Sequence, residues 1–417
     1  MVVERDIYLQ RLISRHRNGM IKVITGVRRC GKSFLLFNLF YKHLIKQGVK
    51  EDHIIKVALD DRINRSLRNP DALCDYVYSQ IKDKEIYYIL LDEVQLVEEF
   101  EDVLNSFLHI DNADIYVTGS NARFLSKDVI TEFRGRGDEV KMYPLSFREF
   151  VSAFPGSRNR ALDEYMIYGG MPQIMSFETE EQKSAYLKNL FTETYLRDIK
   201  ERYHIRHDIE LEELLNIISS DIGSLTNPRK LANTFQSVKG VKIDQTTVKS
   251  YLDCLCDSFL IERAERYDVK GRRYIDTPQK YYFTDMGLRN ARLNFRQDER
   301  THIMENVVFN ELKIRGFNVD VGVVPVTYTD ESGNRKKTQL EIDFVCNQGS
   351  RRYYVQSAWH IESDEKRRQE QASLLKVGDS FKKVVVVGDD IGIHRNEEGI
   401  TTMSIYDFLL NENSLEL

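Results

Sequence analysis

The chain has 417 residues, more than one typical hydrophobic core accommodates, so we expect about two to four domains. With 41% hydrophobic and 30% charged residues, it contains no apolar stretch long enough to cross a bilayer and no N-terminal signal peptide, which predicts a cytoplasmic protein without a membrane partner. The formal net charge of −5 excludes a uniformly basic nucleic-acid coat but leaves local basic patches open.

The first predicted strand, residues 21–25, runs into a glycine-rich loop that fits the phosphate-binding pattern G-x-x-x-x-G-K-[S/T] without a mismatch. Backbone N–H groups of such a loop bind phosphates, its lysine reaches the outer phosphates, and its hydroxyl coordinates magnesium. The predicted ATP and Mg²⁺ site comprises Gly26, Val27, Arg28, Arg29, Cys30, Gly31, Lys32, Ser33 and Phe34. The alternative is a glycine turn with an incidental Lys-Ser pair, which the flanking strand and helix disfavour.

A continuous apolar run at residues 86–91 is typical of a strand buried on both faces of a parallel sheet, and it ends in Asp92 and Glu93. This is a Walker B pattern. Asp92 would hold magnesium through water, and Glu93 would polarise the attacking water, which predicts hydrolysis as well as binding. Two acids that merely solvate a strand end are the alternative, which the neighbouring P-loop disfavours.

The next predicted strand, residues 114–118, leads to Asn121, the candidate sensor of the terminal phosphate. Further along, Arg134 and Arg136 are candidates to neutralise charge on the transferred phosphoryl group. They would act within the chain or across the subunits of a homo-oligomer. For each arginine, a solvated basic turn is the alternative.

Alternating strands and helices continue to about Pro155 and predict an α/β fold with the parallel sheet of a P-loop NTPase in residues 1–155. The expected strands are residues 21–25, 54–59, 86–91, 115–118 and 139–142. Residues 156–209 are mostly helical in pattern, which indicates a connector or lid.

Residues 210–292 have the element order of a winged helix-turn-helix. Helices are expected at 211–221, 228–234 and 245–255, and hairpin strands at 259–267 and 280–283. The third helix exposes polar residues such as Gln245 and Lys249, and residues 270–273 form a basic wing tip. Double-stranded DNA is therefore a candidate partner, and packing against the ATPase or another subunit is the alternative.

Residues 293–417 alternate helix and strand again and present Glu305 on a helix, with Asp343 and Gln356 on successive strands. That order resembles the PD-(D/E)xK nuclease fold, in which such residues collect a divalent metal and a water. The last lysine of the pattern is replaced by Ala358, so we expect a restriction-endonuclease-like domain that is not catalytic. Isolated surface acids are the alternative for each carboxylate.

The whole chain resembles a family of bacterial and archaeal AAA+-like P-loop ATPases that carry a C-terminal domain of unknown function. The blocks that carry this resemblance are residues 25–33, 91–95, 118–121, 134–136, 144–150, 168–172 and 341–345. The resemblance implies an ATPase core, a winged-helix segment and a restriction-endonuclease-like C-terminal region.

These patterns favour an ATP-hydrolysing, AAA+-like switch protein that acts on or binds DNA through its C-terminal domains. One alternative is a nucleotide-stabilised protein-interaction or signalling module with little turnover. The other alternative is a metal-dependent nuclease controlled by ATP.

Overall fold

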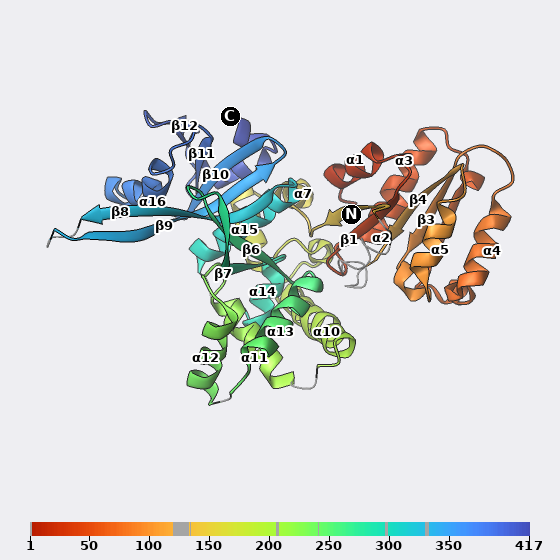
Figure 1. The fold of residues 1–417 in the computed structure, drawn as a ribbon. Helices are drawn as coiled ribbons and strands as arrows, with labels where there is room; N and C mark the ends of the chain where they lie inside the picture. Colours follow the sequence, from red (N-terminus) through yellow and green to blue (C-terminus); the bar gives the residue numbers. More distant parts are fainter. Residues whose placement is uncertain are drawn as a thin grey trace. The chain divides into compact units, whose positions relative to one another are not determined.

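The computed structural model describes residues 2–119, 133, 135–205, 208–240, 242–296, 299–329 and 333–417. These residues form two compact units, Met1–Pro144 with Asp257–Phe259, and Leu145–Cys256 with Leu260–Leu417. Figure 1 shows the elements of each unit along the chain. The finer division at 155, 209 and 292 stays a prediction. Within the described ranges, every helix is too short or too polar to traverse a lipid bilayer.

The first unit is built on a five-stranded sheet of order β2-β3-β4-β1-β5, and each neighbouring pair of strands is parallel. Its strands are β1 Ile21–Gly26, β2 Ile54–Ala58, β3 Tyr87–Asp92, β4 Ala113–Thr118 and β5 Gly137–Met142. All residues of β1 and β3 are buried, as their continuous apolar runs predict. The predicted α/β fold with a parallel sheet is confirmed.

Helices cover both faces of this sheet (Figure 1). On one face, α4 and α5 pack on alternate strand residues in a core that includes Val77, Phe107 and Val117. On the other face, Phe40 packs against Tyr116 with ring centroids 4.4 Å apart. The helical segments of this unit are α1 Asp6–Ser14, α2 Lys32–Phe34, η1 Leu35–Phe40, α3 Tyr41–Lys46, η2 Glu51–His53, η3 Arg62–Arg68, α4 Pro70–Gln80, η4 Val94–Leu96 and α5 Phe100–Phe107.

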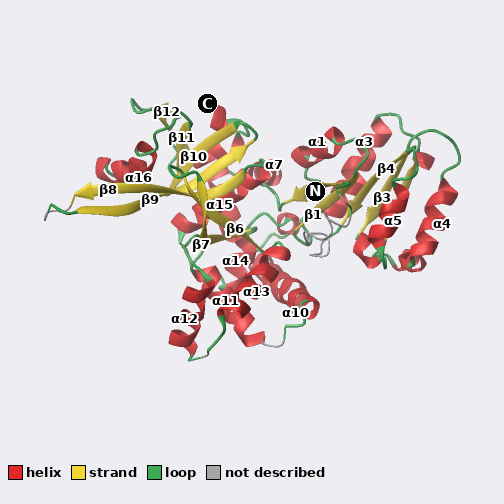
Figure 2. Ribbon diagram, viewed as in Figure 1, coloured by secondary structure: helices red, strands yellow, loops and turns green. Residues whose placement is uncertain are grey.

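The second unit is built on an eight-stranded sheet of order β12-β13-β11-β10-β9-β8-β6-β7. Its strands are β6 Ile261–Asp268, β7 Arg273–Phe283, β8 Asn318–Thr329, β9 Arg335–Gln348, β10 Arg351–Ala358, β11 Lys382–Val387, β12 His394–Arg395 and β13 Ile400–Ser404. Figure 2 shows β8 and β9 as a long antiparallel ribbon. The helical segments around the sheet are α14 Met286–Arg292, α15 Arg300–Ile314, α16 Asp364–Leu375, α17 Ile405–Leu410 and η8 Ser414–Glu416.

The hairpin that the sequence analysis assigns to a wing lies in this eight-stranded sheet. Strand β6 pairs with β7 on one side and in parallel with β8 on the other, with Arg266 opposite Val321. The β6–β8 pairing joins segments that are far apart in sequence, so no local pattern indicates it. The predicted hairpin is present as β6 and β7, and the order of helices and strands is as predicted, whereas the assignment of residues 210–292 to a winged helix-turn-helix stays a prediction.

The helices that precede this hairpin are found where the sequence places them. They are α11 Asp208–Ser220, α12 Pro228–Lys239 and α13 Gln245–Asp257. The Asn227 side chain caps α12 by accepting a hydrogen bond from the Lys230 amide at 2.7 Å. Residues 145–205 form α7 Phe147–Ala153, α8 Arg158–Tyr168, η6 Pro172–Ser176, α9 Glu180–Asn189, η7 Leu190–Leu196 and α10 Arg197–Arg202.

Candidate functional site

The glycine-rich loop lies at the carboxyl end of β1 and leads directly into α2. Gly26 has a φ of 131°, and a Cβ there would come within 2.0 Å of the Met142 carbonyl oxygen, so only glycine fits. Gly31 has a φ of 103°, in the same region. The Lys32 ammonium donates to the carbonyl oxygens of Gly26 at 2.9 Å and Val27 at 3.0 Å. The loop thus folds around the amine that is expected to reach the phosphates.

Arg5 donates hydrogen bonds to the backbone of this loop, a role that the sequence does not predict. Its buried guanidinium donates to the carbonyl oxygens of Cys30 at 2.9 Å and of Tyr143 at 2.7 Å. These bonds tie the loop to the end of β5 across a large separation in sequence. Arg5 directly precedes α1 and is not part of a sequence motif, so its role cannot be predicted from the sequence.

Ser33 and Asp92 meet at the start of α2 and the end of β3. Asp92 accepts hydrogen bonds from the hydroxyls of Thr118 and Ser33. Burial raises the pKa of the Asp92 carboxyl, and these two hydrogen bonds oppose that rise. Neighbouring hydroxyl and carboxylate oxygens are the donors that Mg²⁺ prefers, so Ser33 and Asp92 fit the predicted metal site.

Glu93 follows Asp92 in a left-handed backbone conformation, with a φ of 53°. Its amide donates to the Thr118 hydroxyl at 3.0 Å, and its carboxylate accepts a hydrogen bond from Gln95. Because the same hydroxyl donates to Asp92, Thr118 fixes the two acids relative to each other. Sequence reasoning missed Thr118, although its place at the end of β4, beside the end of β3, is a usable signal.

The remaining predicted residues divide into three groups. Val27 and Cys30 are buried in the loop, and Phe34, half-buried, lies in α2. Arg28, Arg29 and Arg136 are exposed. The predicted sensor Asn121 and the predicted Arg134 lie outside the described residues. The structure therefore brings together Lys32, Ser33, Asp92 and Glu93.

A second cluster of charged side chains lies in the other unit, where α15 packs on the sheet. The Lys280 ammonium of β7 lies 2.9 Å from carboxylate oxygens of both Glu305 and Glu341. Tyr282 donates to Glu305 at 2.6 Å, and the Ser357 amide donates to Asp343 at 2.8 Å. Of these residues, Glu341 is half-buried and the others are buried.

The strand β9 is irregular where it supplies its carboxylates. Its register with β8 shifts between the pairs Asp320–Val345 and Gly322–Ile342. Such a bulge turns a side chain toward the face it would otherwise leave. Burial raises the pKa of Asp343 well above its usual value, and the nearby Glu305 carboxylate adds to the rise.

Two further contacts describe this cluster. Gln356 lies beside Asp343: its amide oxygen accepts a hydrogen bond from the Asp343 backbone N–H at 3.3 Å, and its amide nitrogen donates to Glu370 of α16 at 3.5 Å. Ala358 stands where the nuclease pattern has a lysine. In the structure, Lys280 of β7 places an amine beside Glu305. The nuclease pattern has its lysine on the same strand as Gln356. It therefore does not indicate Lys280, which lies on another strand.

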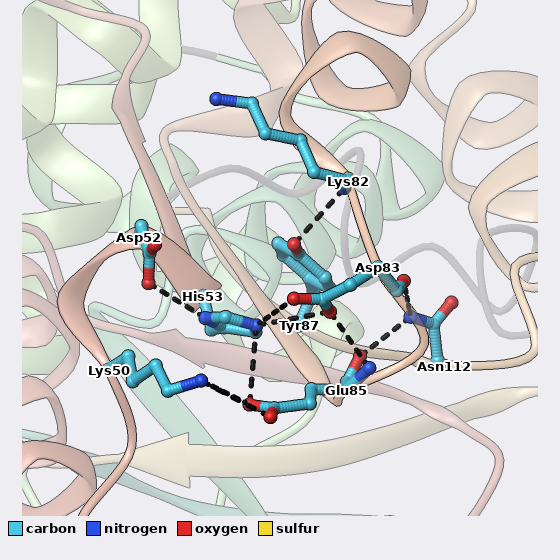
Figure 3. Close-up of polar contacts among 8 residues, drawn as sticks. All are labelled: Lys50, Asp52, His53, Lys82, Asp83, Glu85, Tyr87 and Asn112. Atoms are coloured by element: carbon cyan, nitrogen blue, oxygen red, sulfur yellow. Dashed lines mark hydrogen bonds and ion pairs between the residues drawn. The ribbon is translucent and has the colours of Figure 1, made fainter.

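A third polar cluster lies in the first unit, between the segment before β2 and the segment before β3 (Figure 3). The buried His53 ring contacts Asp52 through Nδ1 at 2.8 Å and Asp83 through Nε2 at 3.1 Å. Glu85 lies 3.5 Å from the same Nε2 atom, and Lys50 pairs with Glu85 at 3.1 Å. The cluster ties the starts of two neighbouring strands together.

The His53 cluster predicts a pH-dependent contribution to stability. The hydrogen bond to Asp52 raises the pKa of His53, burial opposes the rise, and Asp83 adds to it. Because the folded-state pKa is raised, the stabilisation is complete below the unfolded pKa of about 6.5 and is lost as the pH rises through the folded value.

We expect His53→Gln to lower the free energy of unfolding by about 0.2–1 kcal/mol more at about pH 5.5 than at about pH 8.5, since its carboxylate partners are exposed. Denaturant titrations at both pH values measure this difference. The exposed His109 provides the matched control, and a His53→Gln effect independent of pH would contradict the prediction.

Comparisons with known proteins agree with this description of the first unit. Residues 18–151 match the family described as an AAA domain, and residues 159–299 match a domain of unknown function. An uncharacterized protein of Haemophilus influenzae is 32% identical over 98% of this chain and 99% of its own length. An uncharacterized protein of Methanocaldococcus jannaschii is 28% identical over 93% of this chain and 86% of its own length.

Among solved structures, the Aeropyrum pernix ORC1 protein in complex with DNA is similar over 70% of this chain and 92% of its own, with 12% identity. Its TM-score is 0.28.

Proposed function

Because this chain belongs to the family of the Haemophilus influenzae protein and contains an AAA domain, we propose that it is an ATP-hydrolysing switch. The observation that carries the proposal is the meeting of four side chains at the carboxyl ends of β1 and β3. The Lys32 ammonium donates to a carbonyl of the loop, and the Ser33 hydroxyl forms a hydrogen bond with Asp92. Glu93 is the next residue after Asp92. In parallel sheets this end of the strands is where ligands bind.

In the proposed reaction, backbone N–H groups of the loop and Lys32 bind the phosphates of ATP. Ser33 and Asp92 would hold Mg²⁺, which when bound neutralises charge on the β- and γ-phosphates. Glu93 orients and polarises a water for attack on the γ-phosphorus. The bond from that phosphorus to the ADP oxygen breaks, which leaves ADP and inorganic phosphate. The Thr118 hydroxyl, which bonds to the Glu93 amide and to the Asp92 carboxylate, fixes the positions of these two residues during this step.

The proposal includes double-stranded DNA as a partner and a homo-oligomer as the working form. Support for DNA comes from α13, on which Gln245, Thr246 and Lys249 are exposed. Support for an oligomer comes from Arg136, whose exposed guanidinium is available to a neighbouring subunit. The predicted roles of Asn121 and Arg134 belong to the same proposal.

The test of this function is ATP turnover by the purified full-length chain with Mg²⁺, with and without duplex DNA. We expect turnover by the protein alone and faster turnover with DNA, with a DNA affinity that falls as salt rises. A chain that hydrolyses no ATP in either condition contradicts the enzymatic proposal. Turnover unchanged by DNA, together with no salt-dependent DNA binding, contradicts the partner.

A second candidate function, metal-dependent cleavage of nucleic acid, is favoured by one observation. Lys280 supplies the amine that the β10 sequence lacks, beside the carboxylates of Glu305 and Glu341. With Asp343 nearby, these acids are candidate ligands for a divalent ion, which when bound would lower the pKa of a water. Lys280 would stabilise charge on the phosphate as water attacks the phosphorus and the phosphodiester P–O bond breaks.

The nuclease candidate predicts loss of cleavage on conservative changes in this cluster. We expect wild type to nick plasmid DNA with Mg²⁺ or Mn²⁺, and Asp343→Asn and Lys280→Met to lower the rate by roughly 100-fold or more. Glu365→Gln, an exposed change on α16, is the control and should cleave like wild type. Wild type that does not cleave with either ion, or Asp343→Asn that cleaves at the wild-type rate, would exclude this function.

A further inference from the structure

Three connecting segments of the second unit line an open cavity of about 710 Å³. One segment is the turn between β6 and β7, the second is the turn between β9 and β10, and the third follows α16. The volume lies within the range of about 300–1,000 Å³ that is usual for ligand sites. The cavity is lined by segments that are separated in sequence, so no sequence motif marks it.

The lining of this cavity is strongly cationic. Its charged residues are Lys270, Arg272, Arg351, Arg352 and Lys376, with Asp379 as the acidic member. The Asp379 carboxylate is already engaged, since it accepts a hydrogen bond from Tyr354 at 2.6 Å. A concentration of positive charge in a chain whose net charge is −5 is a local feature that favours an anion with several charges.

Two of these cations have no partner of their own in the described part of the chain. Lys270 donates to the Pro325 carbonyl at 3.0 Å, and Arg351 pairs with Glu416 at 3.3 Å. By contrast, the Arg272 and Lys376 side chains make no hydrogen bond or ion pair among the described residues. They come from different segments and line one cavity, so a bound anion would give both of them a partner.

Aromatic rings line the same cavity. The Arg352 guanidinium lies 5.4 Å from the Tyr267 ring centroid and 5.3 Å from the Phe381 ring centroid. Phe381 is 40% exposed, so its ring is accessible to a ligand. An exposed ring beside several cations is the combination that binds single-stranded nucleic acid, because bases stack on the ring and phosphates contact the cations.

We propose that this cavity binds a segment of single-stranded nucleic acid, with Arg272 and Lys376 on phosphates and Phe381 stacked on a base. The inference deepens the nucleic-acid partner of the proposed function and rests on it. It moves the principal contact from the exposed face of α13 to the cavity, and it changes the preferred ligand from a duplex to a single strand. Lys270 and Arg272, from the segment expected as a wing tip, line one wall of the cavity.

The test measures binding of a fluorescein-labelled oligothymidylate of about 16 nucleotides, the upper end of usual site sizes, by fluorescence anisotropy. The double variant Arg272→Gln/Lys376→Gln should weaken binding about 10-fold or more, and the slope of log affinity against log salt should fall by about 1.4 between about 50 and 200 mM salt. Phe381→Ala should weaken binding roughly 5- to 150-fold with the salt slope unchanged.

The matched control is the double variant Arg160→Gln/Arg229→Gln, which removes two exposed cations from α8 and α12. It should bind the oligonucleotide like wild type. A cavity variant that binds like wild type would overturn the inference, and if Lys249→Gln then loses binding, α13 is the contact instead. Preference for a duplex of the same length would overturn it as well. ATP turnover without nucleic acid is measured on every variant, so a failure of the ATPase proposal is recognised separately.

Discussion

Replacing Lys32 with alanine is expected to lower the rate of ATP hydrolysis by roughly 10²- to 10³-fold, the scale of losing one preorganised charge at the reacting phosphate. The ammonium is buried and held by the Gly26 and Val27 carbonyls, so it is positioned before nucleotide arrives. Loss of a charged hydrogen bond should also weaken ATP binding by about 10- to 150-fold. Steady-state phosphate release and equilibrium binding of a fluorescent ATP analogue measure the two effects.

The control for this variant is Lys46→Ala, which removes an exposed lysine from α3 and should leave both quantities unchanged. Because the Lys32 change also leaves two loop carbonyls without their donor, its thermal unfolding midpoint is compared with that of wild type. Lys32→Met, which retains most of the aliphatic stem, should show the same catalytic loss. Turnover at the wild-type rate in either Lys32 variant would rule out hydrolysis at this loop.

Local patterns in the sequence predict the strands and the glycine-rich loop of the first unit well, because the residues of the candidate site lie at the ends of strands. Each of the five strands of the first sheet begins and ends within about two residues of its prediction. Lys32, Ser33, Asp92 and Glu93 follow from motif spacing alone, and the parallel sheet brings the ends of β1 and β3 to the same edge. The fixed geometry of such a sheet explains this success.

Contacts between distant segments account for what the sequence does not predict. Arg5 bonds to Tyr143 across 138 positions, and Thr118 bonds to Asp92 across 26. Lys280 of β7 and Glu341 of β9 belong to one sheet because β6 pairs with β8, a pairing that no local periodicity encodes. The cationic cavity has the same origin, since its cations come from separate turns.

Glu93→Gln is expected to separate ATP binding from ATP hydrolysis. Glutamine keeps the size of the side chain and one acceptor oxygen for Gln95. In the proposed reaction Glu93 acts on the attacking water and does not bind the phosphates, so ATP affinity should stay within about twofold of wild type. Without the carboxylate no group polarises the attacking water, and hydrolysis should slow by about 10²- to 10⁴-fold.

Single-turnover hydrolysis and nucleotide binding are measured on the same preparation, with Glu98→Gln, an exposed neighbour, as the control. A variant that binds ATP and hydrolyses it at the wild-type rate would remove Glu93 from the mechanism. If wild type itself turns over as slowly as the variant, and both bind nucleic acid equally, the nucleotide is a structural ligand and the interaction-module alternative holds.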